Sequence, residues 1–541
     1  RASCSVLLPA CTCRRSPPHF VMAGQVVVVV DPVSTGGCVA FDAARRGYSV
    51  VAAWCTELAP DMRTQSHVPD VAKGLKYHAE VEERATIPET AAAIREAVGG
   101  MPVVACIVGA ESGVTLADYL SVELKVRTNG IFPLGDRRNK SVQQRAVKAA
   151  GLRAVREALG ATWDEVAAFV DQEPMPIVVK PVESAGSDGV KLCLSKEEAR
   201  AHFQVLMESQ QKFGAQGAAV LCQEFLKGKE YVVDHVSRDG VHKCVMIWVY
   251  DKRPTNGAAF VYYGMVPVPA DSEIAKKLIK YTQGVLDALK LDNGPTHGEV
   301  MMTSDGPCLV EMNCRSHGSD GAWVPLAEML TGGYAQPYAA MDAHADGRAW
   351  AKIPKVFPSP FKAAGQAVML VSFFSGRVRS MPGYDRMRKL SSFVALQTGV
   401  DVGSKVELTV DLLTAVGVLI LANHDAKKLE VDLAEVRKME KEGIFAFDEE
   451  VDPVQAEPSP DTIIPFGRRR SQSDADTAIS FGRRRSQSDE YFAPKEAVVV
   501  SKQVFDQKAA ASLGQQQLFV VAAVSFVAGA LFSQLVSKKM K

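Results

Sequence analysis

The chain has 541 residues, 47% of them hydrophobic, and its 62 Lys and Arg residues balance its 62 Asp and Glu residues. This length exceeds what one hydrophobic core organises and predicts about three or four structural units. The neutral balance excludes the strongly basic profile of a nucleic-acid-binding protein, so no nucleic-acid partner is expected. The 11 cysteines include no CxxC pair, which argues against a disulfide framework or a zinc site and for a reducing compartment.

The first part of the chain predicts an α/β domain. Residues 1–23 contain no Asp or Glu and fit either a disordered targeting segment or an upstream segment preceding a start at Met22. "GQVVVVVDP" (24–32) is a continuous apolar run typical of a buried parallel strand, and a helix ending at Gly47 and further strands follow. We therefore expect a parallel sheet within residues 24–130. Because GxGxxG is absent, the Gly36-Gly37 pair indicates helix packing rather than a dinucleotide loop.

The middle of the chain, residues 131–350, alternates between helix and strand signals. A helix is predicted over 136–155 with a stop at Gly151, and "PIVVKPVESAGSDGVKLC" (176–193) predicts strand, glycine-rich loop and strand. Further strand pairs are expected over 219–237 and 248–268, and a helix over 274–289. Residues 362–450 alternate again, which predicts a small α/β or β-rich domain within residues 351–450.

The composition changes near residue 450. Residues 453–490 contain Pro, Ser, Asp and Arg but few large apolar residues, which predicts a disordered linker over 451–515. The sequence "FGRRRSQSD" occurs in it at 466–474 and again at 481–489. Arg-Arg-x-Ser spacing makes Ser471 and Ser486 candidate phosphorylation sites for a basophilic kinase, and a merely solvated charge run is the alternative.

Residues 518–536 are 19 residues without a charge, followed by "SKKMK". A helix of this length spans roughly 28 Å, which matches the hydrocarbon core of a bilayer. We expect a transmembrane anchor with the catalytic part in the cytosol, in the endoplasmic reticulum or an organelle outer membrane. A buried helix of a soluble domain is the alternative.

The stretch "HGEVMMTSDGPCLVEMNCRSHGSDG" (297–321) predicts a β-hairpin around Asp305. This register places Thr303 opposite Pro307, Met301 opposite Leu309, and Glu299 opposite Glu311. Directly opposed residues lie roughly 5 Å apart, so two facing carboxylates call for a bound cation, and Mg²⁺ takes carboxylates together with phosphate oxygens. Alternation places Asn313 and Arg315 on the same face. A solvent-exposed hairpin with an unimportant charge pair is the alternative.

Other segments supply groups for a nucleotide. Lys140 and Lys180 are cations able to meet phosphates, and the loop "ESAGSDGV" (183–190) offers backbone N–H groups, although it is not a Walker A motif. "QEFLKGKE" (223–230) offers hinge backbone for an adenine and Glu230 for ribose hydroxyls. Each of these segments alone is weak evidence for a nucleotide site, and their order along the chain is stronger evidence.

In this order, the motifs resemble the ATP-grasp superfamily, especially its L-amino-acid (dipeptide) ligase-like and biotin-carboxylase-like members. The resemblance covers about residues 24–450 and implies an α/β and α+β ATP-grasp fold. A Rossmann-like domain would lie at 24–130, the ATP-grasp domain at 131–350 and a small domain at 351–450. It implies ATP contacts from Lys140, Lys180, Gly186, Ser187, Gly189, Glu224, Leu226 and Glu230. It also implies two Mg²⁺ ions, which Mn²⁺ can replace, on Glu299, Glu311 and Asn313, with Arg315 as the catalytic residue.

The resemblance implies that a carboxylate attacks ATP to give an acyl-phosphate, from which an amine displaces phosphate to form an amide. The substrates would be small molecules, a carboxylate and an amine. His317 and Asp320 would contact the substrate, or they would cap the next helix instead. After Asn313, "NCRSHGSDG" departs from the common Asn-Pro-Arg-Pro-Gly-Gly, so the family's substrates do not carry over. A carboxylase-type enzyme using bicarbonate and a non-catalytic nucleotide-binding membrane scaffold are the alternatives, and a homodimer stays open.

Overall fold

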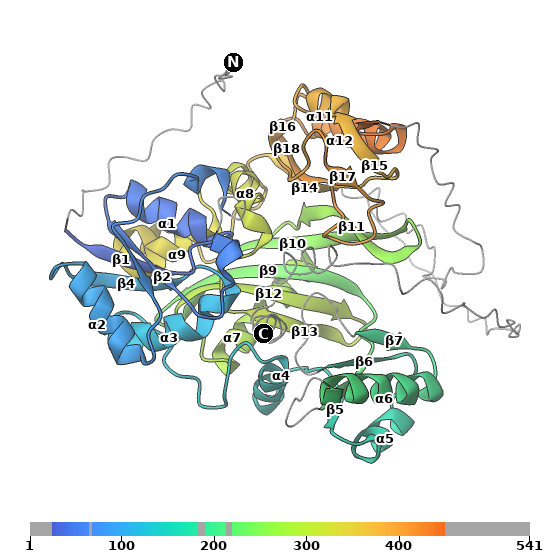
Figure 1. Ribbon diagram of the computed structural model, residues 1–541, viewed down its shortest axis with the longest axis horizontal. Coiled ribbons are helices and arrows are strands. Elements are labelled where there is room, and N and C mark those ends of the chain that lie inside the picture. Colours follow the sequence, from blue (N-terminus) through green and yellow to red (C-terminus); the bar gives the residue numbers. More distant parts are fainter. Residues whose placement is uncertain (1–23, 64–67, 182–189, 213–218, 449–541) are drawn as a thin grey trace, which may run out of the picture. The chain divides into compact units, whose positions relative to one another are not determined.

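The computed structural model describes residues 24–63, 68–181, 190–212 and 219–448 (Figure 1). Several predictions lie outside these residues: the phosphate-loop residues Gly186, Ser187 and Gly189, the linker, Ser471, Ser486 and the membrane span at 518–536. Among the described residues, no helix is long and apolar enough to cross a membrane.

A four-stranded parallel sheet with the order β3-β2-β1-β4 forms the first domain, as predicted. The valines of β1 are all fully buried because both faces of the strand are covered. Those at 26, 28 and 30 pack with helices α2 and α3, and those at 27 and 29 pack with α1. The elements are β1 (Val26–Val30), α1 (Gly36–Arg45), β2 (Ser49–Trp54), β3 (Ala79–Glu82), α2 (Ile87–Ala97), β4 (Val103–Val108) and α3 (Val114–Glu123).

The Gly36-Gly37 pair serves helix packing, as the sequence indicated. A Cβ atom at Gly36 would lie 2.5 Å from the Cα atom of Gly109, just after β4. Glycine is therefore required for the first turn of α1 to approach the end of this strand.

A second, antiparallel sheet has the order β5-β8-β6-β7. Its apolar residues pack against the amphipathic helices α5 and α6, and Ile177 and Val179 share one buried cluster with Val166 and Phe203. The elements are β5 (Glu157–Gly160), α5 (Trp163–Gln172), β6 (Ile177–Pro181), β7 (Lys191–Cys193), α6 (Lys196–Lys212) and β8 (Val220–Glu224).

The largest sheet has eight strands in the order β13-β12-β9-β10-β11-β14-β18-β16, and part of it crosses the centre of Figure 1. Helices α4 and α7 contribute to its core cluster through Val147 and Val285. The elements are α4 (Lys140–Ala149), β9 (Lys229–Arg238), β10 (Val241–Thr255), β11 (Ala258–Pro267), α7 (Glu273–Ala288), β12 (Gly294–Thr303), β13 (Gly306–Asn313), α8 (Val324–Thr331), α9 (Gln336–Ala345) and α10 (Gly347–Lys352).

Helix α4 is shorter than predicted. It begins at Lys140 because the Asn139 side chain accepts a hydrogen bond from the Val142 backbone, and it ends before Gly151, which has φ +74°.

Three strands after residue 351 join the same large sheet, whereas β15, β17 and β19 form a three-stranded sheet of their own with the order β17-β15-β19. Strand β14 pairs with β11 at Gly264↔Val368, and β18 and β16 continue the sheet beyond it. Residues 351–448 thus build their own apolar cluster with α12 while part of them extends the central sheet. The elements are β14 (Ala364–Leu370), β15 (Gly376–Ser380), α11 (Pro382–Met387), β16 (Phe393–Gln397), β17 (Lys405–Val406), β18 (Gly417–Asn423), α12 (Ala426–Glu442) and β19 (Ala446–Phe447).

Candidate active site

The predicted pairing of Glu299 with Glu311 across the β12–β13 hairpin is confirmed, but by a different register of the turn. The turn contains two residues, so Thr303 pairs with Gly306 and Met301 with Cys308. The predicted pairs Thr303–Pro307 and Met301–Leu309 are therefore wrong. A β-bulge between Glu299 and Val300 shifts the pairing by one residue, which restores the opposition of the two glutamates.

The two glutamates are mostly buried, with 17% and 15% of their side chains exposed. Burial raises the pKa of Glu311, the neighbouring Lys140 lowers it, and the charge of Glu299 raises it again. The Lys140 Nζ atom lies 2.8 Å from Glu311 Oε1. Burial also acts to raise the pKa of Glu299, but the hydrogen bond and charge of His297 outweigh it and hold this pKa below its usual range.

Lys180, on β6, belongs to the same charge cluster as Lys140. Burial and the positive charge of Lys140 lower the pKa of Lys180 to about 8, whereas Glu157 and Glu311 act to raise it. Two lysines that repel each other next to a buried carboxylate make a site that an anionic phosphate would stabilise. The structure thus brings together Lys140, Lys180, Glu299 and Glu311 as the sequence predicted.

The predicted hinge lies at the end of β8, and the Glu224 side chain has a structural role there. Its carboxylate lies 2.6 Å from Arg153 Nη1 and 2.6 Å from Arg156 Nη2, and it accepts a hydrogen bond from the Arg156 backbone. Half-buried Leu226 follows the strand. The contribution of this backbone to adenine binding stays a prediction.

Glu230 forms an ion pair that the sequence did not reveal. Its Oε2 atom lies 2.6 Å from Lys252 Nζ, and Lys252 lies over the Tyr262 ring, 4.3 Å from its centroid. Burial raises the pKa of Glu230, Lys252 lowers it, and the charge of Glu299 raises it, so these groups share one electrostatic environment. The ribose role of Glu230 stays a prediction, and Lys252 is an additional cation of the site.

Arg315 is almost completely buried and is held by two side chains. Its Nη2 atom donates to Asn313 Oδ1 at 3.0 Å, and its Nε atom lies 3.0 Å from Glu111 Oε2. Glu111 follows β4 of the first domain. Glu111 was missed by the sequence reasoning because 204 positions separate it from Arg315 and no local motif marks it.

The loop after Asn313 is bound from several sides. The Thr35 hydroxyl donates to His317 O at 2.6 Å, and the Asp320 backbone N–H donates to Ser34 Oγ at 3.2 Å. Asp320 itself has φ +47° inside a short 3₁₀ turn. Neither this turn nor α8 has a side-chain cap, so the helix-capping interpretation of His317 and Asp320 is wrong.

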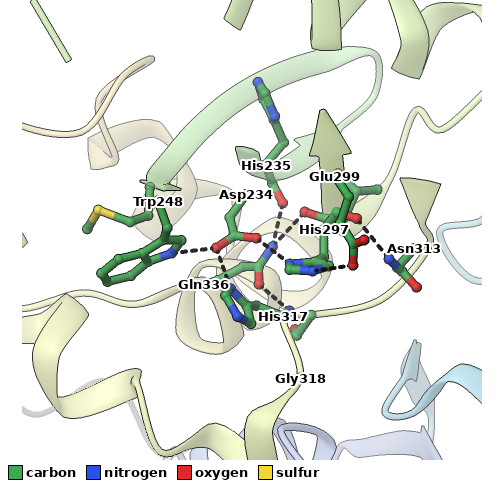
Figure 2. Close-up of polar contacts among 12 residues, drawn as sticks. Asp234, His235, Trp248, His297, Glu299, Asn313, His317, Gly318 and Gln336 are labelled. Carbon is green, nitrogen blue, oxygen red and sulfur yellow. Dashed lines mark hydrogen bonds and ion pairs between the residues drawn. The ribbon is translucent and has the colours of Figure 1, made fainter. Parts of the chain in front are cut away.

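His317 belongs instead to a buried cluster around Asp234 on β9 (Figure 2). The Asp234 carboxylate lies 3.0 Å from His317 Nδ1 and 3.0 Å from His297 Nδ1, and it accepts a hydrogen bond from Trp248 Nε1 at 2.9 Å. Burial acts to raise the pKa of Asp234, but the two imidazoles hold it far below its usual range. Sequence reasoning missed Asp234 and His297. The only local signal was His297 in "HGE", two residues before the predicted metal ligand Glu299.

Comparison with known proteins identifies the domain. A family model described as "ATP-grasp domain" matches residues 173–322. Dapdiamide A synthase of Enterobacter agglomerans is 29% identical over 342 residues, covering 62% of this chain and 79% of that protein. Alanine–anticapsin ligase of Bacillus subtilis is 25% identical over 211 residues, covering 36% of this chain and 44% of that protein.

Solved structures agree on the fold. The L-amino acid ligase from Bacillus licheniformis superposes with a TM-score of 0.57 at 15% identity, over 76% of this chain and 97% of that one. An N5-carboxyaminoimidazole synthetase from Staphylococcus aureus gives 0.53 at 13% identity, over 77% and 98%. These matches confirm the resemblance seen in the sequence: the chain contains an ATP-grasp domain, and it is similar to proteins named as a synthase and as amino-acid ligases.

Proposed function

We propose that the protein activates the carboxylate of an amino acid with ATP and joins it to an amine, forming an amide bond. The observation that carries this proposal is the opposition of Glu299 and Glu311, with Lys140 on Glu311 and Arg315 held beside Asn313. The names of the relatives, alanine–anticapsin ligase and L-amino acid ligase, support an amino acid as the carboxylate substrate.

The donor set suits magnesium. Two carboxylates and the amide oxygen of Asn313 are hard oxygen ligands, and the mutual repulsion of the buried glutamates favours a cation between them. Glu299, Glu311 and Asn313 would hold the ion or ions. When bound, Mg²⁺ neutralises phosphate charge and orients the transferred phosphoryl group.

The remaining groups of the chain bind and orient the reactants. Lys140 can exchange its contact with Glu311 for an ATP phosphate, because both partners are partly accessible, with 23% and 15% of their side chains exposed. Lys180 adds a second cation on the side of the small sheet. Arg315, oriented by Glu111 and Asn313, would stabilise the charge on the oxygens of the acyl-phosphate.

The test is phosphate release by the full chain with Mg²⁺, ATP and a panel of amino acids, singly and in pairs. We expect release that requires a particular amino acid and an amine acceptor, with an amide product detected by mass spectrometry. Glu311→Ala should abolish ADP formation while the protein stays folded, as checked by circular dichroism. Turnover retained in Glu311→Ala contradicts the assignment of the metal ligands, and release that requires only bicarbonate would favour a carboxylase-type enzyme instead.

A further inference from the structure

Asp234 lies between two histidines that belong to different parts of the site. His297 is on β12, two residues before Glu299, whereas His317 is in the loop after Arg315. The two imidazole rings lie with their centroids 4.3 Å apart, and each presents Nδ1 to one oxygen of the same carboxylate. Figure 2 shows both rings beside Asp234, while the neighbouring His235 points away.

The contacts of Asp234 describe a hydrogen-bonded carboxylate. The side chain is 0% exposed, so its charge requires donors from the protein. Oδ1 faces His297 Nδ1, and Oδ2 faces both His317 Nδ1 and the indole N–H of Trp248. These three donors satisfy both oxygens, which assigns an N–H to Nδ1 of each histidine.

One arm of this cluster reaches the predicted metal ligands. With Nδ1 of His297 directed at Asp234, the opposite ring nitrogen, Nε2, lies 3.3 Å from Glu299 Oε1. An imidazole held at one nitrogen by a carboxylate fixes the orientation of the group at its other nitrogen. The position of Glu299 therefore depends on Asp234 through His297.

The other arm reaches the loop that carries Arg315. His317 donates its backbone N–H to Gln336 Oε1 at 2.8 Å. The Gln336 amide in turn donates to the backbone oxygens of His235 and Thr296, on β9 and β12, at 3.1 and 2.8 Å. Asp234 and Gln336 thus fasten the loop to the two strands, one through the His317 side chain and one through its backbone.

We propose that Asp234 is a positioning residue that couples the Mg²⁺-nucleotide side of the site to the loop of residues 314–321. Occupation of the site at Glu299 and Glu311 is transmitted through His297, Asp234 and His317, and it orders the loop on which Arg315 contacts the substrate. The inference rests on the proposed function for the nature of both ligands. It requires no catalysis for its test, since the coupling is a property of binding.

The experiment is hydrogen–deuterium exchange of the full chain, with and without Mg²⁺ and the non-hydrolysable ATP analogue AMP-PNP. In the wild type we expect Mg²⁺ with AMP-PNP to slow exchange of the amides of residues 314–321 about fivefold or more, within the usual range of coupling between sites. Asp234→Asn should bind the analogue and lose this slowing. The matched control is Asp432→Asn, because Asp432 is also a buried carboxylate, bonded to Ser391 and Ser392 away from this cluster.

A second pair of variants keeps the test independent of the folding of Asp234→Asn. The Asn amide can place an N–H near the position of His Nδ1, so His317→Asn should retain the slowing, whereas His317→Leu should lose it. Slowing that persists in both Asp234→Asn and His317→Leu overturns the inference, as does a wild-type loop that does not respond to Mg²⁺ with AMP-PNP. The inference is also overturned if the wild type binds a transition metal stoichiometrically and Asp234→Asn loses it. In that case Asp234, His297 and His317 would be metal ligands, and Nδ1 of the two histidines would not donate to Asp234. Phosphate release is measured separately, so failure of the proposed ligase reaction is recognised independently.

Discussion

Lys140 pairs with Glu311, and replacing it by methionine tests whether its charge neutralises this carboxylate. The change Lys140→Met keeps the length of the side chain and removes the cation 2.8 Å from Glu311 Oε1. Removing one partner of a buried ion pair costs about 3–5 kcal/mol. Glu311 can avoid part of this cost by taking up a proton, since burial already raises its pKa above the ordinary value of 4.5.

Protonation of Glu311 limits the loss of stability in Lys140→Met. A carboxyl group with a pKa of about 4.5 is neutralised at about pH 7.5 for roughly 4 kcal/mol, and a raised pKa makes this smaller. We therefore expect Lys140→Met to lose about 2–4 kcal/mol of stability at this pH. Such a carboxyl group has a higher pKa in the folded than in the unfolded state. It therefore destabilises the folded protein increasingly as the pH rises above its pKa in the unfolded state. The deficit of the variant should thus be largest at neutral and alkaline pH and should disappear near pH 4.5 and below.

The assay is thermal unfolding with and without millimolar Mg²⁺, across this pH range. Because Mg²⁺ takes over the neutralisation of Glu311, it should raise the melting temperature of Lys140→Met more than that of the wild type. Lys148→Met, an exposed position in the last turn of the same helix, is the control and should change neither quantity. Equal Mg²⁺ responses in Lys140→Met and the wild type would refute the reasoning.

Three further changes have defined outcomes. Arg315→Lys keeps a charge but loses the planar guanidinium group held by Glu111 and Asn313. The kcat should therefore fall about 10²–10³-fold. The affinity for AMP-PNP, measured by calorimetry, should stay unchanged. Gly36→Ala places a Cβ atom 2.5 Å from the Cα atom of Gly109 and should cost about 1–3 kcal/mol in urea unfolding. The control is Gly399→Ala, whose Cβ would meet nothing and whose φ is not positive, and it should change stability little. Removal of residues 515–541 should move the protein from the carbonate-resistant membrane pellet to the supernatant, and a chain found in the supernatant with this segment present contradicts the anchor.

Much of the local structure follows from sequence patterns because the interactions behind it span few residues. The run Val26–Val30 indicates a strand buried on both faces, and the turn residues at 304–306 indicate the hairpin that opposes Glu299 and Glu311. Residue types alone, two lysines and the acid-x-Asn-x-Arg motif, were enough to suggest the ATP-grasp resemblance. The register within the hairpin was not determined at this level, because a two-residue turn with a bulge and a longer turn without one give the same opposed glutamates.

Only the tertiary structure decided which distant groups support these residues. Glu111 reaches Arg315 from the first domain, and Asp234 joins His297 to His317 across three separate segments. Alternation also did not reveal that β14, β18 and β16 extend the central sheet, because a strand pattern reports which faces are buried and not which strand lies beside it. The charged residues of the site were thus recognisable from local motifs. The residues that hold them in place are far away in sequence and close only in space, so no local motif marks them.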